Sequence, residues 1–274
     1  MDSSVSSFLL MLSVSLYIAG FILHVFSFTR GQGHKLALIF MRAGFLISTF
    51  YLAAEAGEHG FFLPISGFSQ ALSFFAWSLA FVYLVLLVKS QTDSFGMIVS
   101  PFLILLTGAA LITRSGVTVE PKAVLMHPYF LLHIGAAFFA YASFTLSFAA
   151  AVLYLIQHHE LKSKKPGAFY HKLASLEELE KLVYQPVLWG TPLLFTAISV
   201  GLLWAHEVYG EMRIFDAKTL ATALTAGLYG AILIMRSMSV LRGKQTALLS
   251  LSAFALVLFA FLGTRLIPGS HHYF

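Results

Sequence analysis

Histidines near the ends of long apolar segments are the residues of this chain best suited to chemistry. Once a membrane topology is assigned, five of its eleven histidines collect on one side, and these are His127, His133, His206, His271 and His272. A neutral imidazole is a good metal ligand, and two imidazoles facing each other across a helix bundle can supply both axial ligands of a haem iron. A single histidine at a membrane boundary is more often an interfacial anchor, so both interpretations stay open at this point.

The elements that must position these histidines are membrane helices. Hydrophobic residues make up 58% of the 274 residues and charged residues only 11%, too few to cover a globule. A helix of about 20 residues crosses the hydrocarbon core of a bilayer. Backbone groups in lipid must be paired within a segment, and the apolar runs are too long and too uniform for barrel strands. We therefore predict eight spanning helices, at about 5–28, 36–54, 69–89, 96–114, 129–157, 184–207, 218–238 and 245–267.

The predicted fold is an all-α, polytopic membrane helical bundle in which residues 1–274 form a single domain. Lys and Arg residues of connections are retained on the cytoplasmic side. One set of connections carries Arg30, Lys35, Lys89, Lys162, Lys164, Lys165, Lys172, Lys181, Arg236, Arg242 and Lys244. The opposite set, with the C-terminal tail, carries only Arg114, Lys122, Arg213, Lys218 and Arg265. Both termini are therefore predicted to be extracytoplasmic, in a multi-pass protein of the cell's inner (cytoplasmic) membrane.

Charge and cysteine content exclude several classes of function. The net charge of +5 follows largely from this topology, so it gives no reason to propose a nucleic-acid partner. The chain has no cysteine, which excludes thiolate catalysis and thiolate metal ligation by the protein itself. Residues 158–181 are interpreted as a short cytoplasmic amphipathic helix or a solvated connector. No span has a clear central carboxylate or lysine, as an ion-coupled transporter would require.

Two histidine sites are predicted to lie at the same depth near the outer surface. His133 is about one turn inside the fifth predicted helix, after His127 and Pro128, and His271 and His272 follow the eighth. The connection from Trp204 to Lys218 on the same side combines aromatic residues, glycine and both signs of charge. A flat macrocycle can stack on aromatic side chains while a cation binds its carboxylates. An ordinary aromatic belt at the membrane interface would have the same composition.

From Pro128 to the C-terminus, roughly half of the chain, a series of motifs in the right order makes the chain resemble the cytochrome c assembly family, the haem-handling membrane proteins of the CcsA and HemX type. The N-terminal half matches only in helix count and in the stretch Ser73-Phe74-Phe75-Ala76-Trp77. The matching pieces are His127-Pro128, Leu132-His133, Tyr141-Ala142-Ser143-Phe144, Tyr154-Leu155-Ile156-Gln157, Leu173 to Leu179, Trp189-Gly190-Thr191-Pro192, Tyr209-Gly210, Phe215-Asp216-Ala217-Lys218, Tyr229, Arg236, Arg242-Gly243-Lys244, and Gly263 through His271-His272-Tyr273.

The resemblance implies that haem binds on the extracytoplasmic face between His133 and His271, as the two iron ligands, with His272 able to replace its neighbour. It also implies presentation of the haem to the Cys-x-x-Cys-His site of an apocytochrome c, together with other membrane assembly subunits. Such a protein binds and positions haem and has no catalytic residues of its own.

The outer connection of this chain differs from the tryptophan-rich loop of that family. Tyr209, Arg213 and Phe215 stand where tryptophans are expected. Asp216 and Lys218 are retained, and with Arg213 they could orient a haem carboxylate. The loss of the tryptophans favours a second hypothesis, a haem-free HemX-like regulatory or scaffold subunit of a membrane complex. Retention of the two flanking histidines favours haem binding.

A second haem inside the membrane is not expected. Family members that move haem outward have two further histidines within the membrane, and the corresponding positions here are Ser48 and Ile234. His24 is the other histidine well inside a span. It has no evident histidine partner in the sequence, and we predict it to be a hydrogen-bonded packing residue. The sequence therefore predicts at most one haem per chain.

Overall fold

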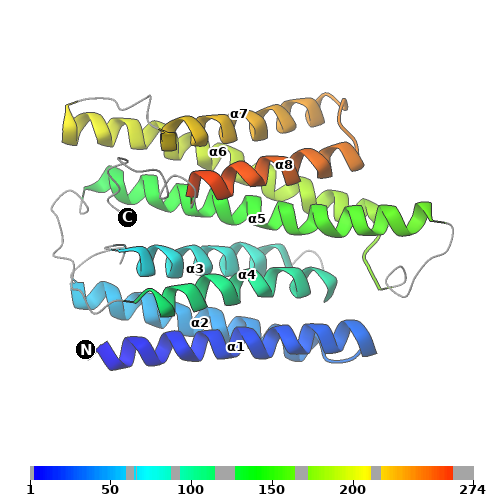
Figure 1. Ribbon diagram of the computed structural model, residues 1–274, viewed down its shortest axis with the longest axis horizontal. Helices are drawn as coiled ribbons and strands as arrows, with labels where there is room; N and C mark the ends of the chain where they lie inside the picture. Colours follow the sequence, from blue (N-terminus) through cyan, green and yellow to red (C-terminus); the bar gives the residue numbers. More distant parts are fainter. Residues whose placement is uncertain are drawn as a thin grey trace. The chain divides into compact units, whose positions relative to one another are not determined.

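All the secondary structure that the computed structural model describes is helical (Figure 1). The structure describes residues 3–59, 65, 67–87, 93–114, 127–163, 172–210 and 217–261. Every helix in these residues is long and apolar enough to cross a membrane, which confirms the prediction of a multi-pass helical protein. In this part of the chain the helices are α1 (Ser3–Arg30), α2 (His34–His59), α3 (Phe68–Leu87), α4 (Asp93–Ile112), α5 (Pro128–Lys162), α6 (Leu176–Tyr209), α7 (Ala217–Ser237) and α8 (Lys244–Phe261).

Helices α5 and α6 extend beyond their predicted bounds, into the segment 158–181. Helix α5 continues to Lys162, and α6 begins at Leu176. The Ser175 side chain caps α6 by accepting a hydrogen bond from the Glu178 backbone N–H at 3.2 Å. The prediction of a separate amphipathic helix is therefore wrong for the described part of residues 158–181. Its charged turns continue the spanning helices because Leu, Glu and Lys are good helix formers in water as well.

The contacts divide the chain into two compact units. Residues 1–126 form unit 1, which holds α1 to α4, and residues 127–273 form unit 2, which holds α5 to α8. The boundary lies next to Pro128, where the resemblance to the cytochrome c assembly family begins in the sequence. The organisation of residues 1–274 as one domain stays a prediction.

Glycines allow the helices of unit 1 to pack closely. A Cβ atom built on Gly44 of α2 would lie 2.7 Å from the ring of Tyr17 in α1, and one on Gly20 would lie 2.8 Å from the sulfur of Met41. Both of these large side chains are almost fully buried between the helices. Ser48 is also buried there, and it donates a hydrogen bond to the Gly44 carbonyl at 2.8 Å while bonding the Tyr17 hydroxyl at 3.2 Å.

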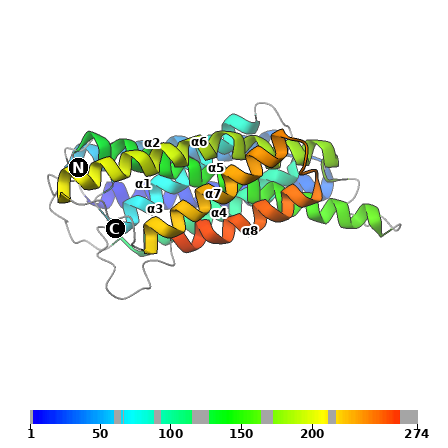
Figure 2. The same ribbon diagram turned by 90° about the horizontal axis from the view of Figure 1, so that it is seen from above.

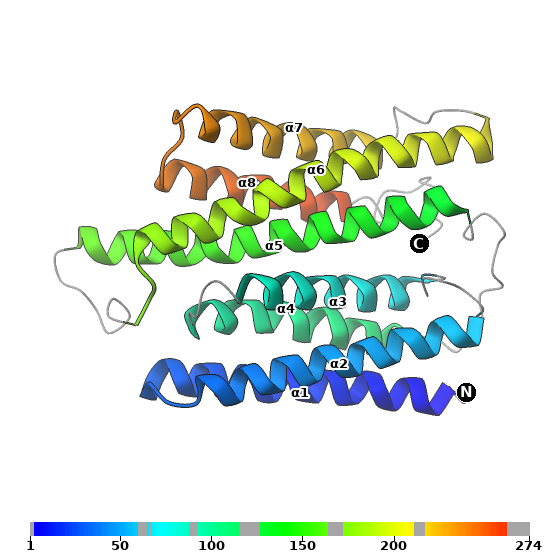
Figure 3. The same ribbon diagram turned by 180° about the vertical axis from the view of Figure 1, so that it is seen from behind.

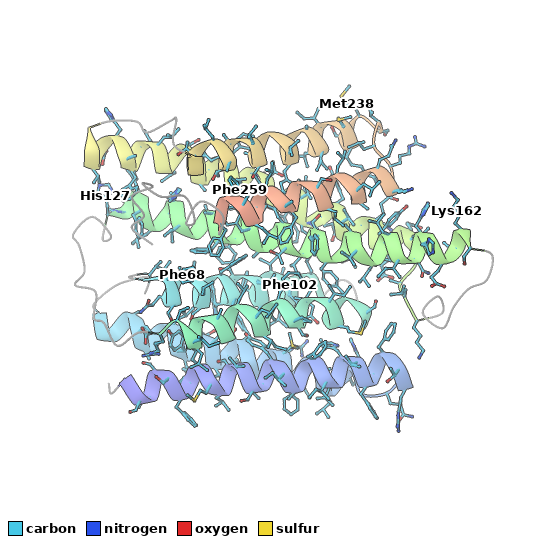
Figure 4. All side chains as sticks on the ribbon, viewed as in Figure 1. Phe68, Phe102, His127, Lys162, Met238 and Phe259 are labelled. Carbon is cyan, nitrogen blue, oxygen red and sulfur yellow. The ribbon has the colours of Figure 1, made fainter. Side chains whose placement is uncertain are left out.

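Unit 2 is built around α5, which packs along α6 and α8, while α7 packs against α8 and α6 (Figures 2 and 3). Figure 4 labels His127 and Lys162 at opposite ends of α5, with Met238, just after α7, toward the Lys162 end. The chain therefore begins α5 and α7, and ends α6 and α8, toward the same end of unit 2. We call this the His127 end.

Candidate haem-binding end of unit 2

His127 caps the start of α5 and joins it to α6. Its Nδ1 accepts a hydrogen bond from the Tyr129 backbone N–H at 3.3 Å, and Pro128 occupies the first turn, where a missing N–H costs nothing. Its Nε2 lies 3.1 Å from a carboxylate oxygen of Glu207, near the C-terminus of α6. These contacts fix the register between the first turn of α5 and the last turn of α6.

His133 lies further along α5 and also contacts α6. Its Nδ1 is 2.7 Å from the main-chain oxygen of Ala197. A carbonyl oxygen can only accept, so Nδ1 carries the proton, and in the neutral ring Nε2 then carries the lone pair. Histidines that ligate metals in proteins usually donate their other ring N–H to a carbonyl or carboxylate, which fixes the tautomer and the ring orientation. The hydrogen bond to Ala197 thus orients the His133 ring and sets its tautomer.

Aromatic side chains lie beside these histidines on both helices. The rings of Phe130 in α5 and Trp204 in α6 are tilted with their centroids 5.2 Å apart, and His127 and Tyr129 lie with centroids 5.2 Å apart. Phe130 is buried, whereas Tyr129 is exposed. At the His127 end, Tyr129 thus offers an exposed aromatic ring beside His127, whereas Phe130 packs inside the unit.

The end of α8 lies close in depth to His133. Phe261, its last described residue, packs edge-on against Phe138 and Tyr141 of α5, with centroid distances of 5.8 and 6.2 Å. Phe138 follows His133 by five residues, which is a rise of about 7.5 Å along a helix. The segment that follows α8 therefore starts only one to two turns deeper than His133.

The structure describes only some of the other predicted site residues, and these only in part. His271, His272, Arg213, Phe215 and Asp216 lie outside the described residues. Two more are placed by their backbones alone, because Tyr209 is the last residue of α6 and Lys218 is the second residue of α7. Of the predicted set, the structure therefore describes the side chain of His133 alone. Among the described residues, no group of three or more His, Cys, Asp or Glu side chains could hold a metal ion.

Sequence reasoning missed the groups on α6 that hold His133. The Ala197 carbonyl and the main chain at Gly201 both contact its ring. A glycine within an apolar run was the only available signal for Gly201, and that signal is common in membrane helices. The sequence also gave no means of pairing His127 with Glu207.

The prediction for His24 is confirmed in one respect and wrong in another. Its side chain is fully buried in unit 1, and Nε2 is 3.3 Å from the Tyr83 hydroxyl, so it is a hydrogen-bonded packing residue. It does, however, have a histidine neighbour, because the His34 ring lies edge-on with a centroid distance of 6.3 Å. The main chain of α4 at Gly96 also packs against this imidazole. Ile234 stands at one of the two positions where family members that move haem outward have a membrane histidine, and its side chain is exposed on α7.

Comparison with known proteins assigns the family. The family model for cytochrome C assembly protein matches residues 65–272, so the match extends further toward the N-terminus than the motifs noted above. The chain is 30% identical to Protein HemX of Bacillus subtilis (strain 168), over 90% of this chain and 88% of the relative. It is 26% identical to Protein HemX of Brevibacillus brevis, over 92% and 93%. It is 27% identical to the cytochrome c biogenesis protein CcsA of Guillardia theta, over 82% and 81%. A family match over most of the chain, including every described helix of unit 2, shows that this protein belongs to the cytochrome c assembly protein family.

Proposed function

We propose that this protein takes part in cytochrome c biogenesis by binding haem at the His127 end of unit 2 and holding it for an assembly partner. The family match and the relatives named as cytochrome c biogenesis proteins support the process. The hydrogen bond from His133 to Ala197 carries the assignment of the site, because it holds the ring as the tautomer in which Nε2 can bind iron. The protein's own role is binding and positioning.

His271 is the second iron ligand in this proposal. It follows Phe261 by ten residues, and Phe261 is packed one to two turns deeper than His133. Ten residues reach about 15 Å as a helix and about 33 Å when extended, which is more than that difference in depth. His272 is the adjacent imidazole and can replace His271. The chain length therefore allows either one to meet the haem that His133 binds.

The connection between α6 and α7 would hold the rest of the macrocycle. It joins the end of α6 to the start of α7, and both of these lie at the His127 end. Tyr209 and Phe215 offer aromatic faces, and Arg213 and Lys218 offer cations for the haem carboxylates, with Asp216 orienting them. Haem, when bound, is the group to which the cysteine thiols of an apocytochrome c become attached. The partners are thus an apocytochrome c and further membrane assembly subunits.

A haem-free regulatory or scaffold subunit is the second candidate function. Tyr209, Arg213 and Phe215 replace the tryptophans of the family's haem-binding loop, which favours this candidate. Two relatives are also named HemX instead of CcsA. In this alternative, the contacts of His127 and His133 with α6 serve only to hold unit 2 together.

Haem titration separates the two candidates. The detergent-purified protein should take up haemin and give the low-spin absorption spectrum of bis-imidazole iron. The variant His133→Ala should give a high-spin spectrum, and so should the double variant His271→Ala with His272→Ala. Added imidazole should restore the low-spin spectrum in each. His159→Ala is the matched control, because this exposed histidine lies near the Lys162 end of α5. A wild-type protein that takes up no haem, or an unchanged spectrum in both variants, would contradict the proposed site.

A further inference from the structure

Gly201 of α6 is pressed against the imidazole of His133. A Cβ atom built on Gly201 would lie 2.5 Å from Nδ1, 2.7 Å from Cε1 and 3.3 Å from Cγ of that ring. The first two distances are shorter than any real Cβ contact, so a side chain at position 201 would displace the ring. The three nearest atoms all belong to the His133 ring.

The carbonyl that His133 binds and the glycine it packs on belong to the same turn of α6. Ala197 is four residues before Gly201, and in a regular helix the Gly201 N–H donates to the Ala197 carbonyl. A carbonyl oxygen has two lone pairs, so it can accept from His133 Nδ1 as well, at 2.7 Å. The ring can reach this acceptor only because no side chain at position 201 stands in its path.

Other glycines of unit 2 have different surroundings. Gly190, also on α6, faces the Phe144 ring, the Ser143 Cβ and the Ala140 carbonyl, which is ordinary close packing of α5 on α6. Gly135 is two residues from His133 on α5, and a Cβ there would meet nothing within 4 Å. Gly201 thus differs from both, because its nearest atoms all belong to one polar ring that also forms a hydrogen bond with Ala197.

We infer that Gly201 is a positioning residue for His133: the bare main chain of α6 at this site seats the imidazole, fixes its proton on Nδ1 and presents Nε2 to iron. The inference rests on the proposed function for the last step, since only haem binding makes Nε2 a ligand. The seating of the ring and its tautomer do not depend on haem.

The first test uses the haem-free protein. Nitrogen-15 NMR of histidine-labelled protein reports the tautomer of each ring, and the His133 signals are those missing from His133→Ala. The wild-type protein should show the Nδ1-protonated tautomer. Gly201→Ala should shift His133 to the Nε2-protonated form or to a mixture, whereas Gly135→Ala should leave the wild-type signals. A wild-type tautomer in Gly201→Ala would overturn the inference, whatever the haem result.

The second test measures haem affinity. Gly201→Ala should weaken haem binding by about 10-fold or more, the usual effect of losing the group that orients a metal ligand. Added imidazole should restore the low-spin spectrum, as in His133→Ala, and Gly135→Ala should bind like the wild type. If the tautomer changes in Gly201→Ala but the wild-type protein binds no haem, the positioning of the His133 ring by Gly201 is supported and the proposed function fails. Unchanged affinity in Gly201→Ala would overturn the role toward iron.

A third measurement distinguishes a specific effect on His133 from a general folding defect in Gly201→Ala. The Gly201→Ala change is made in the wild-type and in the His133→Ala background, and thermal unfolding in detergent is compared. Removing the imidazole removes the three atoms nearest to the new Cβ, so the change should cost clearly less stability in the second background. An equal loss of stability in both backgrounds would show that position 201 packs against something else and would overturn the inference.

Discussion

Glu55 and Arg114 form an ion pair in unit 1, with Nη2 of the arginine 2.9 Å from Oε1 of the glutamate, although the Glu55 side chain is only 2% exposed. Gln70 of α3 donates a hydrogen bond to the other carboxylate oxygen at 3.3 Å, and the guanidinium lies over the Tyr51 ring. The pair therefore joins the C-terminal ends of α2 and α4 to the start of α3.

Breaking this pair should destabilise the protein. Arg114→Ala leaves a buried carboxylate without its cation, and we expect the free energy of unfolding to fall by about 3 kcal/mol. Adding Glu55→Gln to Arg114→Ala should recover part of the loss, since no unpaired charge then remains. Lys181→Ala is the control: its ion pair with Glu177 is exposed, and its loss should not change stability measurably. Equal stability of Arg114→Ala and the wild type in thermal unfolding would contradict this.

Single cysteines can test the predicted orientation, because the chain has none of its own. Ser163 ends α5 at the Lys162 end of unit 2, and Ser270 lies in the C-terminal tail. A maleimide that cannot cross membranes should label Ser270→Cys in intact cells and should label Ser163→Cys only after permeabilisation. The reverse pattern would place the His127 end in the cytoplasm and exclude an extracytoplasmic haem site there.

The protein is expected to bind at most one haem per chain. A macrocycle on His24 would have to displace α4, because the main chain at Gly96 packs against the imidazole and the Tyr83 hydroxyl. His24→Ala should therefore leave the haem content unchanged while lowering thermal stability, since it empties a fully buried site. The measurement is pyridine haemochrome absorbance against protein concentration. A reproducible ratio near two, falling to one in His24→Ala, would show that the pair of His24 and His34 binds haem.

Gly243 should be intolerant of substitution. It has a φ of 47°, its N–H donates to Glu180 at 3.2 Å, and a Cβ there would collide with the Tyr154 hydroxyl. Glu180 also pairs with Arg236, so the turn between α7 and α8 is tied to α6. Gly243→Ala is expected to cost about 2 kcal/mol of stability from backbone strain and the clash. Gly227→Ala, where a Cβ meets nothing within 4 Å, should be neutral or slightly stabilising in the same unfolding assay.

The sequence by itself determined the helices and the place of His133 near the start of α5. A run of about 20 apolar residues has no alternative to a helix in lipid, because only a helix pairs its own backbone groups there. The depth of His133 could also be predicted, because Pro128 fixes where α5 begins and the depth of a residue then follows from the rise of the helix. The motifs from residue 128 onward also led to the family that the comparisons show.

The tertiary structure decided which groups face one another. His133 meets the Ala197 carbonyl and Gly201, more than sixty residues away in the chain, and His24 meets Tyr83, Gly96 and His34 from three other helices. The hydrophobic pattern of a membrane helix is nearly uniform around its axis, so it does not say which face turns inward or how far a helix slides along its neighbour. Close packing of small and large side chains decides both, and it depends on all the contacting helices at once.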